Sequence, residues 1–266
     1  MIDATARVDP AARIAEGVSI GPYCIIGPNV AVAENCTLIA HVHVTGHTTI
    51  GARTAIYPFT SLGTPPQSVH YHGEPTRLEI GADCDIREGV TMNIGTTARG
   101  VTTIGERCFL MANSHVAHNS RIGAHVILAN GALLAGHVEI GDRAFISGNC
   151  IIHQFTRVGT LALMQGGAAA SQDVPPYCLA SGLNGLYGLN AVGLRRAGFD
   201  ADQRMELQRL YRALFRSGMD MGTALRAARA AFSSPAALAM LDFIASSKRG
   251  VCRHAHHATP QREVEA

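Results

Sequence analysis

The sequence predicts a mainly β chain in which a parallel β-helix of short repeats precedes a smaller helical domain. Aliphatic residues recur every six positions, a small residue follows each aliphatic one at a fixed distance, and both patterns stop after Pro175-Pro176. The 28 glycines, 5% aromatic residues and lack of tryptophan agree with many tight turns and disfavour a core of large rings.

The six-residue period starts at Ile2, runs to Leu62, resumes in the same register at Ile80 and ends at Met164. Because a period of six matches neither an α-helix nor a single strand, it indicates hexapeptide strands. Three hexapeptides close one coil of about 18 residues, and stacked coils lie about 4.8 Å apart, so residues 2–170 predict about nine coils.

Small residues occupy the position four after each aliphatic residue, and both sets are expected to point inward. Five of the seven cysteines fall there, which favours packing over a metal site or disulfides. A glycine often follows the aliphatic residue, and this predicts a recurring turn. The five inward cysteines are Cys24, Cys36, Cys84, Cys108 and Cys150.

We expect three segments. Residues 1–189 form the β-helix, with loops at 63–79 and 93–103 that leave the prism while preserving the register. Residues 190–252 form a helical domain, and residues 253–266 a mobile tail that contains three histidines. Helix starts at Asp200, Asp220 and Ser234-Pro235 predict three helices.

The charge pattern excludes several functions. Residues 1–189 hold 10 basic and 13 acidic side chains, and residues 190–266 hold 12 and 7. No basic run is interleaved with aromatic residues, which argues against nucleic acid, and the single Lys248 makes a Schiff base improbable. Without a targeting or membrane-spanning segment, we expect a cytoplasmic protein with no membrane insertion.

Four histidines avoid the inward positions and are expected along one edge of the prism, within about 10 Å of stack height. They are His115, His118, His137 and His153. Such a cluster predicts a catalytic and ligand-binding cleft, and the alternative is a solvated stripe or a subunit seam. His41, His43 and His47 form a second set that we interpret as structural, with a zinc site as the alternative.

Histidines without a catalytic lysine, a nucleophilic serine motif or paired carboxylates suit general-base removal of a proton from a hydroxyl or amine. Direct attack of that group on an acyl thioester needs no covalent enzyme intermediate. Gly136, next to His137, allows the close approach that a backbone oxyanion donor requires.

The sequence resembles the bacterial UDP-N-acetylglucosamine acyltransferases that begin lipid A synthesis, over nearly its whole length. The matching segments are Met1-Ile2-Asp3, Gly73-Glu74-Pro75-Thr76-Arg77, Asn113-Ser114-His115-Val116-Ala117-His118, Leu134-Ala135-Gly136-His137-Val138, His153-Gln154-Phe155, Gln172-Asp173-Val174-Pro175-Pro176-Tyr177 and Gly193-Leu194-Arg195-Arg196.

The resemblance implies a left-handed β-helix and a homotrimer with sites between neighbouring prisms. It implies that His118 is the catalytic base and Gly136 the oxyanion donor. Substrate contacts fall on His115, His137, His153, Gln154, Asn190 and Arg196, and on Ser68 and His70 in the loop that grips the sugar nucleotide.

The implied substrates are UDP-N-acetylglucosamine and a 3-hydroxyacyl chain on acyl carrier protein, whose acidic surface suits the arginine-rich helical domain. No cofactor and no metal are implied, because acyl carrier protein delivers the acyl group as a co-substrate. Gly166 matches the position that sets acyl length, and a glycine there predicts a long chain of the hydroxymyristoyl kind.

Several residues depart from the family pattern. Asn119 replaces an Asp beside the base, and Ser68 and His70 replace an Asp and a Lys. Other departures are Asn93-Ile94 for a His-Arg pair, Val192 for an acidic uracil contact and Ala197 for a second Arg. Fewer cations near the nucleotide predict weaker phosphate contacts or a changed sugar, so N-acylation of a 3-amino sugar nucleotide is an alternative.

Three further functions compete with these. One is the related N-acyltransferase that acts later in the same pathway, which usually carries an extra N-terminal domain, whereas this repeat begins at residue 2. A second is a zinc-dependent hydratase resembling carbonic anhydrase, and a third is a β-helix with a scaffold role only.

Overall fold

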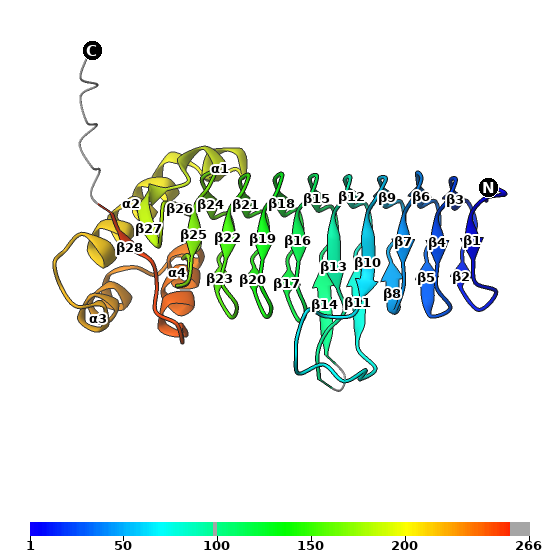
Figure 1. Cartoon of the computed structure of the whole chain (residues 1–266). Helices are drawn as coiled ribbons and strands as arrows, with labels where there is room; N and C mark the ends of the chain where they lie inside the picture. Colours follow the sequence, from blue (N-terminus) through cyan, green and yellow to red (C-terminus); the bar gives the residue numbers. More distant parts are fainter. Residues whose placement is uncertain (98–99, 256–266) are drawn as a thin grey trace, which may run out of the picture.

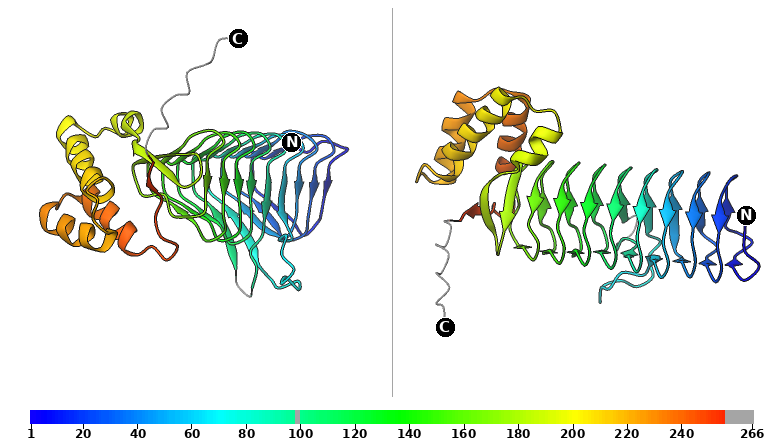
Figure 2. Two further views of the ribbon diagram at one scale, coloured as in Figure 1. Left: turned by 60° about the vertical axis from the view of Figure 1, so that its left-hand side comes forward. Right: turned by 90° about the horizontal axis from the view of Figure 1, so that it is seen from above.

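The computed structural model describes residues 1–97 and 100–255, which form a long triangular prism with helices at one end (Figure 1). Three parallel sheets run along the prism, and successive strands of the chain belong to successive sheets. The chain therefore winds around the prism axis, and Figure 2 shows the coils stacked one behind another. None of the helices in the described residues has the length and apolar character that a membrane span requires.

Each sheet takes every third strand of the coils. Sheet 1 contains β1 (Arg7–Val8), β4 (Ile25–Ile26), β7 (His43–Val44), β10 (Ser61–Thr64), β13 (Thr91–Asn93), β16 (His115–Val116), β19 (Leu133–Leu134), β22 (Ile151–Ile152) and β25 (Ala169–Ala170). Sheet 2 contains β2 (Arg13–Ile14), β5 (Val30–Val32), β8 (His47–Ile50), β11 (Arg77–Ile80), β14 (Val101–Ile104), β17 (Arg121–Ile122), β20 (Glu139–Ile140) and β23 (Arg157–Val158). Sheet 3 contains β3 (Ser19–Ile20), β6 (Thr37–Leu38), β9 (Ala55–Ile56), β12 (Asp85–Ile86), β15 (Phe109–Leu110), β18 (Ile127–Leu128), β21 (Phe145–Ile146), β24 (Leu163–Met164), β26 (Cys178–Ser181), β27 (Gly185–Leu189) and β28 (Arg253–His254).

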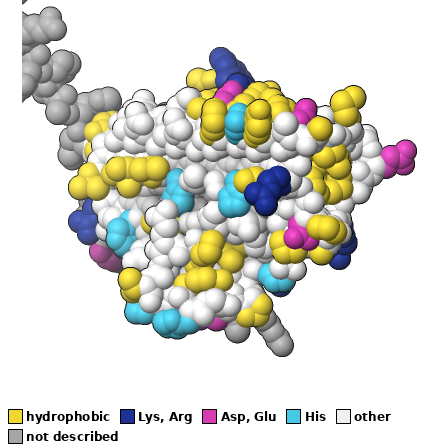
Figure 3. All heavy atoms as spheres, turned by 45° about the vertical axis from the view of Figure 1, so that its right-hand side comes forward, with side chains coloured by type: hydrophobic (Ala, Val, Ile, Leu, Met, Phe, Trp, Pro, Cys, Tyr) yellow, Lys and Arg dark blue, Asp and Glu magenta, His cyan; other side chains and the backbone are white. Residues whose placement is uncertain are grey.

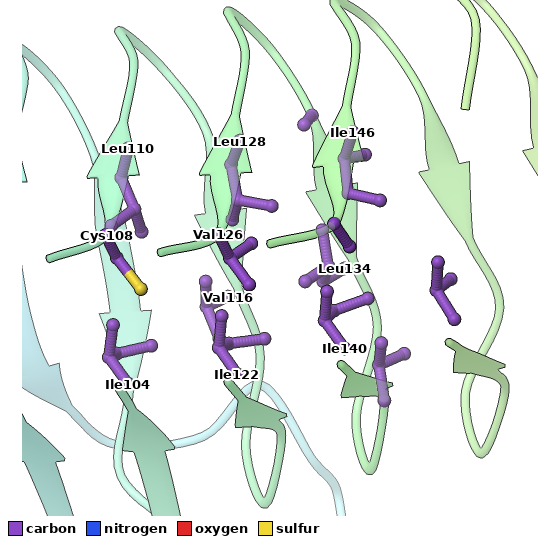
Figure 4. Packing of buried hydrophobic residues seen from close by; sticks show 14 of the residues in the cluster. Ile104, Cys108, Leu110, Val116, Ile122, Val126, Leu128, Leu134, Ile140 and Ile146 are labelled. Atoms are coloured by element: carbon purple, nitrogen blue, oxygen red, sulfur yellow. The ribbon is translucent and has the colours of Figure 1, made fainter. Parts of the chain in front are cut away.

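The core of the prism consists of stacked columns of aliphatic side chains. Leu110, Leu128 and Ile146 lie on consecutive strands of sheet 3, pair in register and are fully buried. Figure 4 shows such columns pointing inward from all three sheets. The small positions are buried as predicted, including all five inward cysteines. Burial of these side chains is the main favourable contribution to stability.

The corners of the prism lie between consecutive sheets, and we call them the 1–2, 2–3 and 3–1 corners. At the 2–3 corner the predicted glycines do not have the left-handed backbone. A Cβ on Gly105 would lie 2.5 Å from the backbone of Gly123 in the next coil, so close coil packing requires the glycine. The left-handed residue comes two positions later, as at Arg107 (φ 55°) and His125 (φ 57°).

The two interruptions of the repeat are shorter than predicted. Strands extend into the expected loops, because β11 pairs over four residues with β8 and β14. The described residues that leave the prism are therefore 65–76, 94–97 and 100, and they lie on one side of it (Figure 1).

The helical domain begins where β27 pairs antiparallel with β26 and ends the stack of coils. It contains α1 (Ala191–Arg196), α2 (Ala201–Phe215), α3 (Met221–Ala231) and α4 (Pro235–Ala245). The three predicted helix starts are confirmed, since Asp200, Asp220 and Ser234 are N-caps whose side chains accept backbone N–H groups. The short helix α1, capped by Asn190, was not predicted.

The predicted boundary of the tail at residue 253 is wrong. Arg253 and His254 form β28, which pairs in parallel with β27, because the chain returns from α4 along the end of the prism. The Tyr211 hydroxyl lies 2.9 Å from Nδ1 of His254 and holds this strand against α2. The remaining tail, residues 256–266, lies outside the described residues.

A buried ion pair attaches the helical domain to the last coil. The Asp173 carboxylate, 1% exposed, accepts hydrogen bonds from the backbone N–H and guanidinium of Arg157 at 2.8–2.9 Å and from the Ser247 hydroxyl at 2.8 Å. Arg157 also donates to the Phe243 carbonyl (3.0 Å) and stacks on that ring at 4.3 Å. The pair thus joins α4 and the segment after it to the prism.

We predict that Asp173→Ala lowers the free energy of unfolding by about 3–5 kcal/mol, because it leaves the Arg157 guanidinium without its charged partner. Urea denaturation followed by circular dichroism measures this. The matched control is Asp242→Ala, which removes the exposed pair with Arg229 and is expected to cost less than about 1 kcal/mol. Equal effects of the two substitutions would show that Asp173 does not secure the domain.

Candidate active site

His118 lies at the 1–2 corner, just after β16, and its imidazole is half-buried. Its Nδ1 is 2.9 Å from Oδ1 of Asn119, the next residue. Asn119 has the left-handed backbone of the corner (φ 61°), which turns its side chain back beside the imidazole. Asn119 therefore orients the His118 imidazole.

Gly136 lies one coil further along the same corner, against the His118 ring. A Cβ at Gly136 would lie 2.5 Å from Cε1 and 2.7 Å from Nε2 of His118, so only glycine leaves room for this ring. The Gly136 N–H donates to no acceptor within residues 1–97 and 100–255. This corner therefore offers a basic nitrogen and a free backbone donor side by side.

His137 and Phe155 continue the column of His118. The His137 ring meets the His118 ring edge-on at 5.3 Å and stacks on Phe155 at 4.6 Å. Burial, and then the neighbouring His118, lower the pKa of His137 below its ordinary value of 6.5. The neutral form of His137 is therefore favoured.

The prediction that all four histidines lie along one edge is wrong for His115. This residue lies on β16, and its side chain points outward from sheet 1. The reason is its place in the hexapeptide, directly before the inward Val116. Its Nδ1 lies 2.7 Å from the Thr91 hydroxyl on the neighbouring strand β13. Burial and the nearby His118 lower its pKa as well.

His153 and Gln154 lie one coil beyond His137, at the same corner, and both are exposed. His153 Nδ1 is 3.1 Å from the backbone carbonyl oxygen of Gln154. The predicted histidines thus lie around one corner and on the adjoining strand of sheet 1.

A cleft of about 550 Å³ opens beside this corner over sheet 2. Asn119, His137 and Phe155 line it, and so do Arg121, Glu139, Lys248 and Arg249, which the sequence reasoning missed. Arg121 and Glu139 could have been predicted as site residues, because they hold outward positions on the strands that follow His118 and His137. Lys248 and Arg249 could not, since they arrive from beyond α4.

Ser68 and His70 lie in the projecting segment 65–76, where the Ser68 hydroxyl accepts the His70 backbone N–H at 3.3 Å. Within the described part of the chain, no hydrogen bond or ring contact joins either residue to the four histidines of the site. Asn93 is buried, and its amide donates to the Thr64 hydroxyl (3.0 Å) and the Pro65 carbonyl (3.1 Å). The departure at residue 93 therefore anchors the start of this segment.

Three other predicted residues lie away from the 1–2 corner. Gly166 belongs to the 3–1 corner. Asn190 caps α1 and donates to the Leu161 carbonyl at 2.9 Å, at the 2–3 corner, and Arg196 is exposed near the end of α1. One prism alone does not bring these residues to His118.

The second histidine set does not converge on one point. His41 stacks between Tyr23 and Phe59 at the 3–1 corner, whereas His43 and His47 lie on sheets 1 and 2. Figure 3 shows histidines dispersed over this end of the prism. Within residues 1–97 and 100–255, no three histidine, cysteine or acidic side chains are grouped as metal ligands.

Two family models match parts of this chain. The family described as Udp N-acetylglucosamine O-acyltransferase, domain 2, matches residues 173–252, and the bacterial transferase hexapeptide family matches residues 102–136. Acyl-[acyl-carrier-protein]–UDP-N-acetylglucosamine O-acyltransferases from Halorhodospira halophila and Azorhizobium caulinodans are both 46% identical, covering 95% and 99% of this chain and 99% and 98% of theirs.

A crystal structure of a UDP-N-acetylglucosamine acyltransferase from Bacteroides fragilis matches with a TM-score of 0.92 and 38% identity, over 95% of this chain and 100% of that one. The shared fold over nearly the whole chain confirms the prediction of a left-handed parallel β-helix with a C-terminal helical domain.

The lowered pKa of His115 and His137 predicts how stability depends on pH. The unfolded chain binds protons on these imidazoles near their ordinary pKa of 6.5, whereas the folded chain binds them only at lower pH. The stabilisation is therefore complete above pH 6.5 and is lost as the pH falls through that value toward the folded pKa.

We predict that the urea midpoint falls between pH 7 and pH 5 and that His115→Gln makes this fall shallower. His43→Gln is the matched control, because His43 occupies the same outward position two strands before β13 in sheet 1. An unchanged slope in His115→Gln, or an equal change in both variants, contradicts the prediction.

Proposed function

This chain belongs to the acyl-[acyl-carrier-protein]–UDP-N-acetylglucosamine O-acyltransferase family, and from that premise we propose that His118 is its general base. The chain is an acyltransferase of lipid A biosynthesis. The proposed reaction moves a 3-hydroxyacyl chain from acyl carrier protein to the 3-hydroxyl of UDP-N-acetylglucosamine.

The observation that carries this proposal is the placement of the His118 ring between Asn119 and Gly136. Nδ1 faces the Asn119 oxygen, so Nε2 is left to accept a proton. Gly136 lies against the same ring, and its N–H has no acceptor among the residues that the structure describes. A general base and a preorganised oxyanion donor are the two groups that acyl transfer from a thioester needs.

In the proposed reaction, Nε2 of His118 takes the proton of the sugar hydroxyl while the oxygen attacks the thioester carbonyl. The tetrahedral oxyanion accepts the Gly136 N–H. Its collapse expels the carrier thiolate, which takes the proton from the His118 imidazolium. Every proton and electron pair is accounted for without a cofactor.

The cleft over sheet 2 supports binding of an anionic substrate next to the base. Arg121, Lys248 and Arg249 line it, and these cations suit a nucleotide diphosphate. His115, His137, His153 and Gln154 are proposed to contact the substrates. Ser68 and His70 are proposed to contact the sugar nucleotide from the projecting segment.

We propose that the active enzyme is a homotrimer, because the proposed site residues lie on different corners of one prism. Within one chain, His118 lies at a different corner from Asn190, Arg196 and Gly166, the proposed acyl-length determinant. We propose that a neighbouring prism brings its own copies of these three residues to His118. A Cβ on Gly166 would lie 3.6 Å from the nearest atom, the Gly148 carbonyl oxygen, so position 166 has no side chain that would shorten an acyl site, and we propose a long chain of the hydroxymyristoyl kind.

The helical domain is proposed to receive acyl carrier protein. A cavity of about 620 Å³ between β27, α1 and α2 is rimmed by Arg195, Arg204, Arg212 and Arg216. No acidic side chain from residues 1–97 or 100–255 lines it. The charge of this rim complements an acidic carrier. Both proposed substrates are water-soluble, which supports a cytoplasmic enzyme.

We predict that His118→Ala lowers kcat by at least about a hundredfold, because it removes the general base. A radiolabelled acyl-transfer assay measures the rate, and light scattering checks that the assembly is unchanged. His43→Ala is the control and should keep the parent rate, since His43 lies outside the site. Retained activity in His118→Ala would remove His118 from its role.

Subunit complementation tests the shared site. His118→Ala and Arg196→Ala chains are each expected to be weakly active, and co-expressed mixtures are expected to regain activity, because some interfaces then pair one intact corner with one intact α1. Mixed trimers without any gain over the separate variants would contradict a site built from two chains.

A further inference from the structure

The amide of Asn119 is held on both sides by one residue, Thr96. Asn119 Oδ1 accepts the Thr96 backbone N–H at 2.9 Å and the Thr96 hydroxyl at 2.8 Å, and Asn119 Nδ2 donates to the Thr96 carbonyl at 3.3 Å. Because the backbone of Thr96 presents one donor and one acceptor, the amide fits in one orientation only. Its oxygen therefore faces the His118 imidazole.

This orientation decides which nitrogen of His118 carries the hydrogen. The Asn119 oxygen is an acceptor only and lies 2.9 Å from Nδ1, so Nδ1 must donate. The lone pair of the neutral imidazole is then on Nε2, beside Gly136. The side chain of Asn119 thus sets the tautomer that general-base catalysis needs.

Thr96 lies in the second segment that leaves the prism, and the segment is shaped to hold it there. Thr96 is 7% exposed, and the Thr76 hydroxyl donates to the carbonyl of the preceding Gly95 at 2.6 Å. A Cβ on Gly100 would lie 2.0 Å from the Thr96 carbonyl oxygen and 2.8 Å from Asn119 Nδ2. Gly100 therefore leaves the space in which the Thr96–Asn119 pair forms.

We propose that Thr96 is a positioning residue for His118: acting through Asn119, it fixes the orientation and the tautomer of the general base. This inference rests on the proposed function, since it assigns Thr96 to the same reaction. It gives Thr96 a purpose in the reaction, because its backbone groups and hydroxyl orient Asn119.

The arrangement also selects an amide over a carboxylate. An Asp at position 119 would keep the two bonds from Thr96 N–H and hydroxyl, but its second oxygen would face the Thr96 carbonyl, where Asn119 donates. The titratable groups that face His118 are His115 and His137. The cleft beside it adds the charged side chains of Arg121, Glu139, Arg157, Asp173, Lys248 and Arg249. In Asn119→Asp, the new carboxylate favours a protonated His118, so the acidic limb of kcat/KM against pH should move to higher pH.

The test combines kinetics with a direct view of the tautomer. Thr96→Val keeps the shape and backbone of Thr96 but removes its hydroxyl, and Asn119→Ala removes the amide. Thr97→Val is the matched control, because Thr97 is the same residue type one position on and is exposed. Two-bond hydrogen–nitrogen correlation spectra of histidine-labelled protein, with His118→Ala for assignment, report which imidazole nitrogen is protonated.

We expect Thr96→Val to lower kcat about tenfold with little change in KM, and Thr97→Val to keep the parent kcat. Asn119→Ala is expected to lower kcat more, and Thr96→Val added to it should cause no further loss, because Thr96 acts only through Asn119. The parent spectrum should show His118 protonated on Nδ1, with a mixture of tautomers in Asn119→Ala.

Additive effects of the two substitutions, or a His118 signal protonated on Nε2 in the parent protein, would overturn the proposal. The spectra need no substrate, so they separate this inference from the proposed function. If the parent protein transfers the acyl group but His118 is protonated on Nε2, the role of Thr96 is rejected and the proposed function is not. The expected tautomer without any transfer activity rejects the proposed function instead.

Discussion

In-register stacking of the coils is the constraint on which the rest of the structure depends. Parallel pairing places each hexapeptide position directly over its equivalent in the next coil, and the narrow interior accepts one aliphatic and one small side chain per strand. At the 1–2 corner the same stacking sets Gly136 against the His118 ring and continues the column with His137. The repeat itself therefore positions His118, Gly136 and His137 beside one another.

The features that depend on local sequence could be predicted. The six-residue period gives the strands, the inward columns and the corner that gathers His118 and His137, because a coil of fixed length converts sequence spacing into spatial proximity. Helix starts at Asp200, Asp220 and Ser234 were also readable, since an N-cap acts over three residues.

The features that depend on contacts between distant segments could not be predicted. The bonds from Asn119 to Thr96 cross 23 residues, and Lys248 reaches the cleft only because the chain returns along the prism after α4. The glycines that follow the aliphatic residues were visible in the sequence, but the reason for them was not. They are needed because the backbone of the next coil packs closely against them, and not because they have a left-handed φ. In the sequence, Asn119 was visible only as the replacement of an Asp. In the structure, its amide pairs with the N–H and the carbonyl of Thr96.

We propose that this chain esterifies the 3-hydroxyl of UDP-N-acetylglucosamine. The most direct measurement offers the purified protein 3-hydroxyacyl carrier proteins of several lengths, together with UDP-N-acetylglucosamine and its 3-amino analogue in competition, and identifies the products by mass spectrometry. We predict that the main product is the hydroxymyristoyl ester of UDP-N-acetylglucosamine. Preferential formation of the amide, or no acyl transfer to either sugar, would contradict it.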